Sequence, residues 1–513
     1  MKRKLNILQS ALLLSAFFLS SALIAQDNLL ELLPGSDRLE YDEKTGIHKL
    51  YGNVNFKYQS NLMYCDSAYY YQRREQVFAY GNVHINKRDT LNLFCDSLFY
   101  NGRTRQAKLW GNVRVRDNEY KLTTDTLDYD ARAGQASYKH GGVVESILSR
   151  ERLTSRVGYF HPESKNFYFS KDVTYKSNEM SMTTDTLRYL YANQTAYFYG
   201  PTDISTKDAD LFCKSGWYNT RTEEGTLRHD ARIERPGELI RGDTLEYRPT
   251  LQEYIGRGNV FYYDSTEQNF FTGDYAYRSD SLNYTLLTGD AIASRELSDD
   301  TLNLHADTIY YEEIDSVNLI RAYYNAKIYS TSFQSVADSI VYDQSVGKIE
   351  CFHYPIVWAE GAELKGDYIV LNLEDTLLKT AEVDQNATVI MPVEKDELYN
   401  QIAGKKILAF FKNNELDQAN VDGNAMTIAF PEDEVKGPED TTLVIKRMGM
   451  NRLYASRLRI DVDSNEIVGV SYIDQPDGKF YPMDKIQKDE MFVPGFIDRS
   501  ALRPKDREDF LND

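Results

Sequence analysis

An acidic side chain returns about every 30 residues along most of the chain, inside a phrase of the type Asp-Thr-Leu-x-Tyr. Carboxylates can act as general acids, bases or metal ligands, but such chemistry needs one exceptional group in a cleft, and here nearly every phrase carries one. A repeated Asp at the start of a strand more often caps a bend through its side chain. We therefore expect a structural column. The index residue, numbered zero, is Asp or Ser: Asp37, Asp66, Asp96, Asp125, Ser155, Asp185, Ser215, Asp243, Asp274, Asp307, Asp338 and Asp367.

Other residues with catalytic or metal-binding potential are scattered. The 7 histidines form neither a His-x-His pair nor a His-Glu-x-x-His signature, and the sequence has no phosphate-binding Gly-rich loop and no Gly-x-Ser-x-Gly elbow. Residues 461–465 open like a calcium loop, but Glu466 replaces the required Gly and Tyr472 stands where the bidentate Glu belongs. A polar hairpin turn is favoured there. The sequence therefore predicts no enzyme, no cofactor and no metal site.

The regular spacing indicates a stack of similar structural units, because a fixed period of this length is typical of repeat proteins. Position +2 is apolar throughout and position +4 is usually Tyr, whereas +1 and +3 are mostly polar. This alternation predicts a strand with one buried face. Position +2 holds Leu39, Ala68, Leu98, Leu127, Val157, Leu187, Trp217, Leu245, Ala276, Ile309, Ile340 and Ile369, and position +4 holds Tyr41, Tyr70, Tyr100, Tyr129, Tyr159, Tyr189, Tyr247, Tyr311 and Tyr342.

A second phrase follows the index residue at one fixed distance in six repeats, where it begins at Gly52, Gly81, Gly111, Gly200, Gly258 and Gly289. Four of these glycines begin the triplet Gly-Asn-Val. Gly within a strand pattern suggests a bend or bulge, so each repeat is predicted to form two to four short strands. If each unit adds one strand spacing of about 4.8 Å, the twelve clear units and two weaker ones span about 60–70 Å. The +2 and +4 columns then line a long trough or flattened tube.

Cys65 and Cys95 occupy the same position in consecutive repeats. If that position falls on adjacent strands, about 4.8 Å apart, a Cys65–Cys95 disulfide is within geometric range. The alternative is a column of small buried residues. The position holds Thr124, Thr154, Thr184, Gly242, Gly273, Ala306 and Ala337 in other repeats, and the sequence leaves both readings open.

Residues 1–25 differ from the rest of the chain. Lys2, Arg3 and Lys4 precede an apolar stretch that ends in small residues, which predicts a secretory signal peptide, with an uncleaved membrane anchor as the alternative. The formal net charge of -19 disfavours binding to nucleic acid or to an anionic membrane. An anionic ligand would have to be held mainly by apolar burial.

The two phrases in fixed order, repeated behind a signal peptide, resemble the OstA-like family. Thr124-Asp125-Thr126-Leu127-Asp128-Tyr129 and the Gly-Asn-Val triplets carry the resemblance, which covers about residues 35–480. The family includes the periplasmic lipopolysaccharide transport protein LptA and the N-terminal domain of the outer-membrane translocon LptD. Residues 449–455 and the Leu502-Arg503-Pro504-Lys505 tail look like those of long Bacteroidetes-type members.

The resemblance implies an all-β, elongated repeat β-jellyroll (a β-taco) of about 12–14 rungs, whose apolar groove holds the acyl chains of lipid A. It implies no catalysis. The candidate groove residues are Leu39, Tyr41, Tyr70, Leu98, Tyr100, Leu127, Tyr129, Leu187, Tyr189, Leu245, Tyr247, Ile309 and Tyr311. Core packing and groove lining favour the same residue types, so the sequence cannot separate them.

The implied partners are lipopolysaccharide and other OstA-like-fold transport proteins docked edge to edge, including an LptD-like translocon. The implied location is the periplasm of a Gram-negative bacterium, with association with the outer membrane left open. The predicted regions are a signal peptide (1–25), OstA-like repeats (27–395), C-terminal rungs (396–490) with an acidic insertion at 431–440, and a polar tail (491–513) that lies loosely or binds something.

Two alternatives remain on sequence grounds. One is a closed parallel β-helix that binds or cleaves polysaccharide on its outer face, and the other is a structural or adhesive solenoid. The first would need one outer strip of acids and bases, and no repeat stands out. The sequence leaves open whether the role is bridging or accessory, which rungs contact lipid, whether the groove is open, and the oligomeric state.

Overall fold

The structure, a computed structural model, describes residues 30–511 except 59–60, 88–90, 162–165, 297–299, 316, 360, 375–376, 395–396, 413–414, 437–442 and 464–465. The predicted signal peptide lies outside the described residues. The chain divides into two units, a first unit ending at Arg221 and a second unit beginning at Thr222. Both units are built almost entirely of strands.

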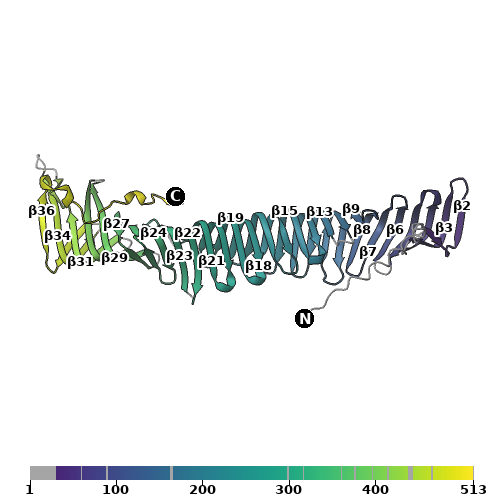
Figure 1. Cartoon of the computed structure of the whole chain (residues 1–513), viewed down its shortest axis with the longest axis horizontal. Coiled ribbons are helices and arrows are strands. Elements are labelled where there is room, and N and C mark those ends of the chain that lie inside the picture. Colours follow the sequence, from purple (N-terminus) through teal and green to yellow (C-terminus); the bar gives the residue numbers. More distant parts are fainter. Residues whose placement is uncertain are drawn as a thin grey trace, which may run out of the picture. The chain divides into compact units, whose positions relative to one another are not determined.

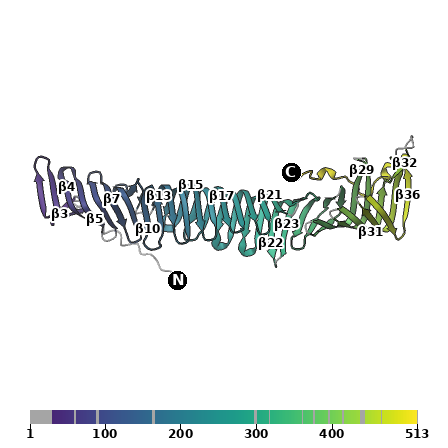
Figure 2. The same ribbon diagram turned by 180° about the vertical axis from the view of Figure 1, so that it is seen from behind.

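The first unit is an antiparallel meander, in which each long strand pairs with the next through a short turn (Figures 1 and 2). At its start two short strands pair with the two halves of the third. The strands are β1 (Glu31–Leu33), β2 (Arg38–Asp42), β3 (Ile47–Tyr58), β4 (Asn61–Tyr71), β5 (Gln76–Lys87), β6 (Leu91–Asn101), β7 (Gln106–Arg116), β8 (Tyr120–Asp130), β9 (Gln135–Tyr138), β10 (Gly142–Ser146), β11 (Arg152–Ser155), β12 (Val157–His161), β13 (Asn166–Lys176), β14 (Met180–Leu190), β15 (Thr195–Thr206) and β16 (Asp210–Asn219). Two of the long strands are interrupted at the bend, so β9 and β10 pair with the two halves of β8, and β11 and β12 with the two halves of β13.

The second unit continues the same pattern. Its strands are β17 (Gly225–Arg235), β18 (Glu238–Arg248), β19 (Glu253–Asp264), β20 (Asn269–Ser279), β21 (Tyr284–Glu296), β22 (Thr301–Ile314), β23 (Val317–Tyr329), β24 (Phe333–Asp343), β25 (Lys348–Phe352), β26 (Ile356–Ala359), β27 (Ala362–Lys365), β28 (Tyr368–Glu374), β29 (Leu377–Glu394), β30 (Leu398–Lys412), β31 (Glu415–Ala429), β34 (Gly449–Asp463), β35 (Glu466–Ile473) and β36 (Asp477–Pro482). β32 (Glu432–Lys436) lies within the predicted acidic insertion and pairs with β33 (Leu443–Arg447), which follows the insertion, as a separate two-stranded sheet.

In the described residues, helical structure is confined to single turns. These turns are the 3-10 turns η1 (Gln72–Arg74), η2 (Tyr191–Asn193), η3 (Pro249–Leu251), η4 (Asp280–Leu282), η5 (Met483–Lys485), η6 (Lys488–Glu490) and η7 (Ser500–Leu502), and the helix α1 (Arg507–Leu511). The predicted all-β repeat jellyroll is therefore confirmed. The strands pair antiparallel, so the closed parallel β-helix considered from the sequence is wrong.

A bulge bends the long strands in the middle. In β3, Gly52 and Asn53 have φ of 71° and 50°, and the register with β4 shifts between Tyr51 and Val54. Two extra residues in the left-handed region turn the chain sharply and restore the inward direction after the bend. Leu50 before the bulge and Val54 after it are therefore both buried.

The bend divides each long strand into two arms, and the two arms face each other across a shared interior. We call the arm that holds positions +2 and +4 the tyrosine arm, and the opposite arm the facing arm. In β4 they comprise residues 67–71 and 61–65. Along each strand, inward and outward residues alternate, as in any half-buried strand.

Each repeat contributes two long bent strands, one hairpin, to the sheet. The lower limit of the predicted two to four strands is therefore correct. The rise per repeat is two strand spacings, about 9.6 Å. The length of about 60–70 Å predicted from the sequence was wrong because it allowed only one strand spacing for each repeat.

Two index positions were also wrong by one residue. In one repeat the inward residues are Gly158 and Phe160, so its index residue is Arg156 rather than Ser155. In the other they are Gly216 and Tyr218, so its index residue is Lys214 rather than Ser215. Val157 and Trp217 consequently lie on the outer side, half-buried, outside the aliphatic column.

Candidate functional site

In six repeats, the acidic column ties the bulge to the preceding strand. The side-chain amide of the bulge Asn donates to the index Asp, with N–O distances of 2.8 Å for Asn82 to Asp66 and for Asn112 to Asp96. The same contact recurs at Asn53–Asp37, Asn259–Asp243, Asn325–Asp307 and Asn386–Asp367. These carboxylates are structural, as predicted. Asp37 and Asp367 directly precede β2 and β28, whereas the other four stand in the middle of strands.

The paired glycine leaves room for the carboxylate. A Cβ built on Gly81, whose φ is 72°, would stand 2.4 Å from an oxygen of Asp66. Gly is therefore favoured at this position both by backbone conformation and by space. The Gly-Asn-Val phrase and the Asp phrase, separate in the sequence, are two halves of one contact.

One repeat replaces the usual pair with an ion pair. Arg156 occupies the index position and Asp172 the bulge position, and their side chains approach to 2.6 Å. The two residues are as far apart in the sequence as Asp66 and Asn82 are. The sequence search for Asp missed this repeat because it required one residue type instead of a complementary pair.

Most of the predicted groove residues point into the interior and are buried there: Leu98, Leu127, Leu187, Tyr189, Leu245, Tyr247, Ile309 and Tyr311. Burial raises the pKa of Tyr189 and of Tyr311 to about 12. Tyr70 and Tyr100 are only half-buried. Leu39, Tyr41 and Tyr129 are 49%, 52% and 36% exposed.

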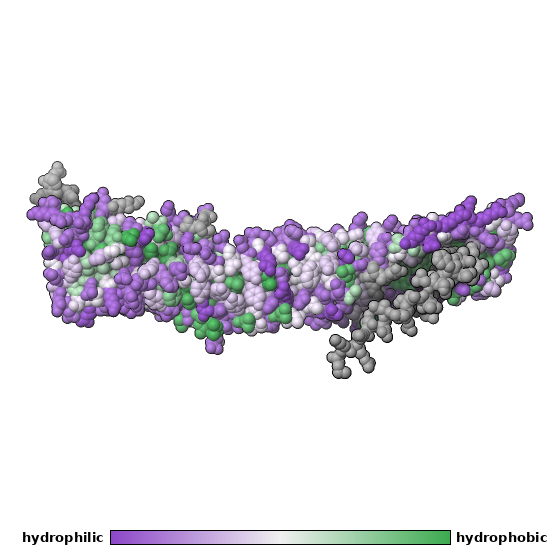
Figure 3. All heavy atoms as spheres, viewed as in Figure 1, coloured by the Kyte–Doolittle hydropathy of each residue, from purple (hydrophilic) through white to green (hydrophobic). Residues whose placement is uncertain are grey.

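The first rungs therefore present an accessible apolar interior. On the facing arm, Ile85, Leu93 and Val115 point inward yet are only half-buried. We call the surface formed by Leu39, Tyr41, Tyr70, Ile85, Leu93, Tyr100, Val115 and Tyr129 the N-terminal trough. Figure 3 shows a hollow at this end of the first unit, with hydrophobic side chains visible inside it. Two ring contacts cross between the arms there, Phe56–Tyr70 and Tyr58–Tyr100, with centroids 5.9 and 5.8 Å apart.

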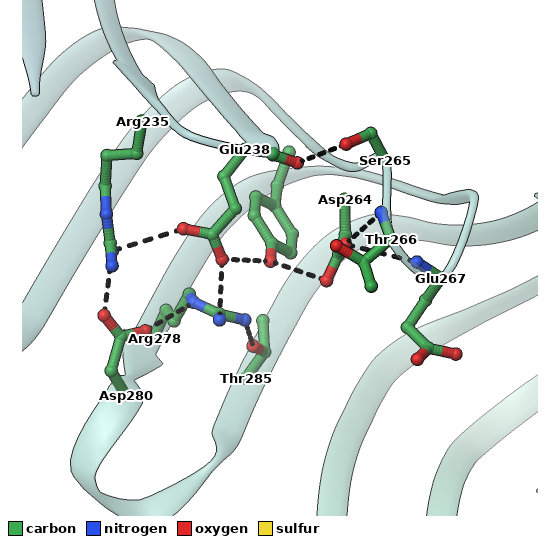
Figure 4. A network of polar contacts seen from close by, with 11 residues as sticks. Arg235, Glu238, Asp264, Ser265, Thr266, Glu267, Arg278, Asp280 and Thr285 are labelled. Atoms are coloured by element: carbon green, nitrogen blue, oxygen red, sulfur yellow. Dashed lines mark hydrogen bonds and ion pairs between the residues drawn. The ribbon is translucent and has the colours of Figure 1, made fainter.

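In the second unit, a charged network joins the tips of the two arms (Figure 4). Arg235 and Glu238 lie at a tip of the facing arm, and Arg278 and Asp280 at a tip of the tyrosine arm. Arg235 contacts Asp280 at 2.8 Å, and Arg278 contacts both Glu238 and Asp280 at 2.8 Å. The four charged side chains are only 14–25% exposed. We call these four residues the clasp.

The interior beneath the clasp is filled by side chains. Tyr262 donates to Glu238 at 2.9 Å, and burial raises its pKa. The cavity there has a volume of about 20 Å³ and is lined by residues including Ile233, Leu245 and Leu287. Such a volume admits about one water molecule. This cavity has no room for an acyl chain.

The C-terminal segment 486–511, which we call the strap, packs on the outer side of the facing arm. Gln401 donates to the carbonyl of Met491 and accepts from the N–H of Val493, at 2.8 and 2.9 Å. Farther along, Arg503 donates to Gln334 at 2.7 Å. Val493 and Phe510 are 2% and 1% exposed. Of the two expectations for the tail, lying loosely or binding something, its contacts with the facing arm agree with the second.

The strap completes a second apolar core outside the bent sheet. Phe510 packs against the rings of His305 and Tyr329 at 6.1 and 5.8 Å. Nearer its start, Val493 joins a cluster with Leu398, Met426, Ile428, Phe430 and Met450. The sequence signal was the pair of apolar residues Val493 and Phe510 within a charged stretch.

The four cysteines are buried and form no disulfide. Cys65 lies on β4 and Cys95 on β6, with β5 between them. Two strand spacings, about 9.6 Å, exceed the Cα range of a disulfide. The structure therefore contradicts the proposed disulfide and supports the column of small residues. Burial raises the pKa of both thiols to about 12.

The terminal strands expose apolar side chains. Leu39 and Tyr41 lie on β2, next to the start of the sheet. At the other end, Val468 of β35 and Phe480 of β36 are 65% and 53% exposed. Within the described part of the chain, no group of three or more His, Cys, Asp or Glu side chains is placed to hold a metal ion. A search of those same residues finds no helix with the length and apolar character needed to cross a membrane.

Comparison with known proteins finds a family model that matches part of the chain. The model of the OstA-like proteins matches residues 32–185 and 170–243. No curated protein matches the chain. Among solved structures, LptH of Pseudomonas aeruginosa is similar, described as the LptA-homologous periplasmic component of a lipopolysaccharide transport device. It shares 18% identity, with 21% of this chain and 75% of that chain covered and a TM-score of 0.19. Over residues 32–243, which carry the bent rungs and the N-terminal trough, the chain is similar to the OstA-like protein family.

Proposed function

We propose that this chain is a periplasmic lipid-binding protein of lipopolysaccharide transport to the outer membrane. It would hold acyl chains of lipid A in the N-terminal trough and would make or break no covalent bond. The observation that carries the proposal is the contrast between Leu93 and Tyr100, inward but half-buried, and Leu245 and Tyr262, which are buried. An apolar interior that its own side chains leave accessible is a site for an apolar ligand.

The energetics fit this role. Burying ten methylenes of an acyl chain would contribute about 8 kcal/mol before the cost of ordering the ligand. The trough would thus bind lipid through apolar contact, as a chain of net charge -19 requires for an anionic ligand. The filled interior beneath the clasp would take no part in acyl binding.

We further propose that the exposed edge at β2 docks another protein of the OstA-like fold. Leu39 and Tyr41 stand inside the interior at this edge, where a partner strand would extend the trough and cover them. Antiparallel or parallel strand addition supplies the backbone hydrogen bonds. An LptD-like outer-membrane translocon is the partner that the family suggests.

The test places a photocrosslinking amino acid at three positions of the full-length protein in cells. Tyr100 lies in the trough, Phe99 is its neighbour on the outer face of the same strand, and Tyr262 lies beneath the clasp. We expect lipid A adducts, identified by mass spectrometry, at position 100 and not at 99 or 262. Adducts that are absent at 100, or equally strong at 99, would contradict the trough as the lipid site.

A further inference from the structure

A hollow on the outside of the second unit is not explained by lipid binding. It has a volume of about 410 Å³ and is lined by Thr308, Tyr310, Glu312, Arg321, Tyr323 and Tyr324. These residues come from β22 and β23 and alternate with Ile309 and Ala322, which are fully buried in the interior. The hollow therefore opens on the outer face of the tyrosine arm. Its volume falls within the range of about 300–1,000 Å³ typical of small-molecule sites.

Tyr324 adopts the left-handed conformation of the first bulge position, which holds Gly in some repeats and Lys171, His229 or Gln385 in others. Its φ is 62°, at the bulge position occupied elsewhere by Gly52, Gly81 and Gly258. A bulky side chain in the left-handed region carries a steric cost. Tyr324 is nonetheless 63% exposed, so burial of its ring does not offset this cost.

The next repeat places a tyrosine at the second position of its bulge, after His353. Tyr354 has φ of 57° at the following bulge and is 78% exposed. The left-handed backbone at these positions belongs to the bulges themselves, as in other repeats. The fold does not require the two exposed tyrosine rings on successive bends, and such exposed aromatic rings point to a ligand outside the sheet.

A strip of tyrosine rings leads across the strands to the hollow. Tyr277, Tyr284, Tyr310 and Tyr323 lie on β20, β21, β22 and β23, one ring on each. The centroids of successive rings are 6.2, 6.0 and 5.7 Å apart. Cross-strand aromatic pairs stabilise a sheet, but this strip continues into the exposed ring of Tyr324, which has no such role.

The polar groups of the hollow define the chemistry of its ligand. Glu312 and Arg321 form an ion pair, so together they offer an acceptor and donors without net charge. Thr308 adds a hydroxyl that can donate or accept. Phenol rings offer apolar faces with polar rims. A ligand with hydroxyls on its edges and C–H groups on its faces matches this combination, and the acidic chain disfavours a polyanion.

We propose that this outer hollow and the tyrosine strip form a binding site for a neutral saccharide chain. One sugar ring would occupy the hollow against Tyr323 and Tyr324, with its hydroxyls bonded to Glu312 and Arg321. Further sugars would follow the strip towards Tyr277. The site is independent of the trough, because it lies on the outer face of its strands and the trough is formed by inner faces.

The test uses the full chain and measures binding by isothermal titration calorimetry. The probes are hexasaccharides of glucose, galactose and N-acetylglucosamine, and the delipidated carbohydrate of lipopolysaccharide. The variant is Tyr324→Asn, because Asn accepts the left-handed conformation and the fold should keep or gain stability. Loss of an aromatic contact worth about 0.5–1.5 kcal/mol predicts roughly 2- to 10-fold weaker binding.

The matched control is Tyr199→Asn, which removes another 54% exposed tyrosine from an outer face of the first unit. It should leave saccharide affinity unchanged. The proposal is overturned if no probe binds the wild-type chain, or if Tyr324→Asn binds the probes as well as wild type does. Dependence on Tyr324 with the free hexasaccharides or with the lipopolysaccharide carbohydrate supports it and tells the two sources apart.

Discussion

At the scale of single residues, the repeated chemistry of this chain serves geometry. Most bends place two residues in the left-handed region, and the backbone of those residues loses its pairing with the neighbouring strand. A carboxylate and an amide on neighbouring strands satisfy each other there, as Asp66 and Asn82 do. Arg156 and Asp172 show that the position demands complementarity rather than one residue type.

Exchanging the charges tests that interpretation. Arg156→Asp places two carboxylates together and should lower the urea midpoint of unfolding, because like charges repel. Adding Asp172→Asn recreates the contact of the other repeats and should restore most of the loss. The alternative, two independent surface effects, predicts that the double variant is no more stable than the sum of the single ones. The measurement is a double-mutant cycle in urea with Asp172→Asn alone as control.

At the scale of elements, the bent hairpin is the repeating unit and the strap is its exception. The hairpins bury their inner face against one another across two arms. The outer face of the facing arm in the second unit is also apolar, and the strap covers it. A segment of charged sequence can dock in this way because a few buried side chains, such as Val493 and Phe510, supply the contact.

Phe510→Ala should release the end of the strap without unfolding the sheet. Truncating a buried Phe costs about 3–5 kcal/mol, which exceeds what a single-turn helix such as α1 can contribute alone. Amide hydrogens of residues 500–511 should exchange at least tenfold faster, whereas those of β22 and β23 stay protected. Leu502→Ala, at a 51% exposed position of the same segment, is the control and should change little. Equal protection in wild type and Phe510→Ala would mean that the ring does not anchor the strap.

At the scale of the whole molecule, the same inward columns serve two purposes. In the first rungs they form an accessible surface, and in the second unit they form a closed core under the clasp. Consecutive repeats never bring the same position onto adjacent strands, because each repeat is a hairpin and its second strand lies between them. That rule places Cys65 and Cys95 two strands apart and keeps all four cysteines out of disulfides.

Thiol titration checks this arrangement over the whole chain. Burial raises the pKa of Cys65, Cys95 and Cys351 to about 12, so at pH 8 almost no thiolate exists in the folded state. The native protein should react with a thiol reagent very slowly. In urea without a reductant, four equivalents should react at once. Only two equivalents would reveal a Cys65–Cys95 disulfide and contradict the two-strand spacing.

The sequence by itself determined the period, the strands, the inward columns and the structural role of the repeated Asp residues. The strands and the inward columns follow from the alternation within each repeat. The period follows from the recurrence of the phrase along the chain. The sequence also pointed to the family, through the two phrases together. It missed Arg156 and Lys214, because a complementary pair has no fixed residue type.

Only the tertiary structure decided the rest. Whether Tyr100 or Tyr247 is covered depends on how closely the opposite arm approaches, and that arm lies elsewhere in the sequence. The clasp joins residues 40 and 45 positions apart, and the strap reaches back 169 positions to Gln334. Local pattern cannot encode such distances, because an apolar side chain looks the same in a groove, in a core and beneath a strap.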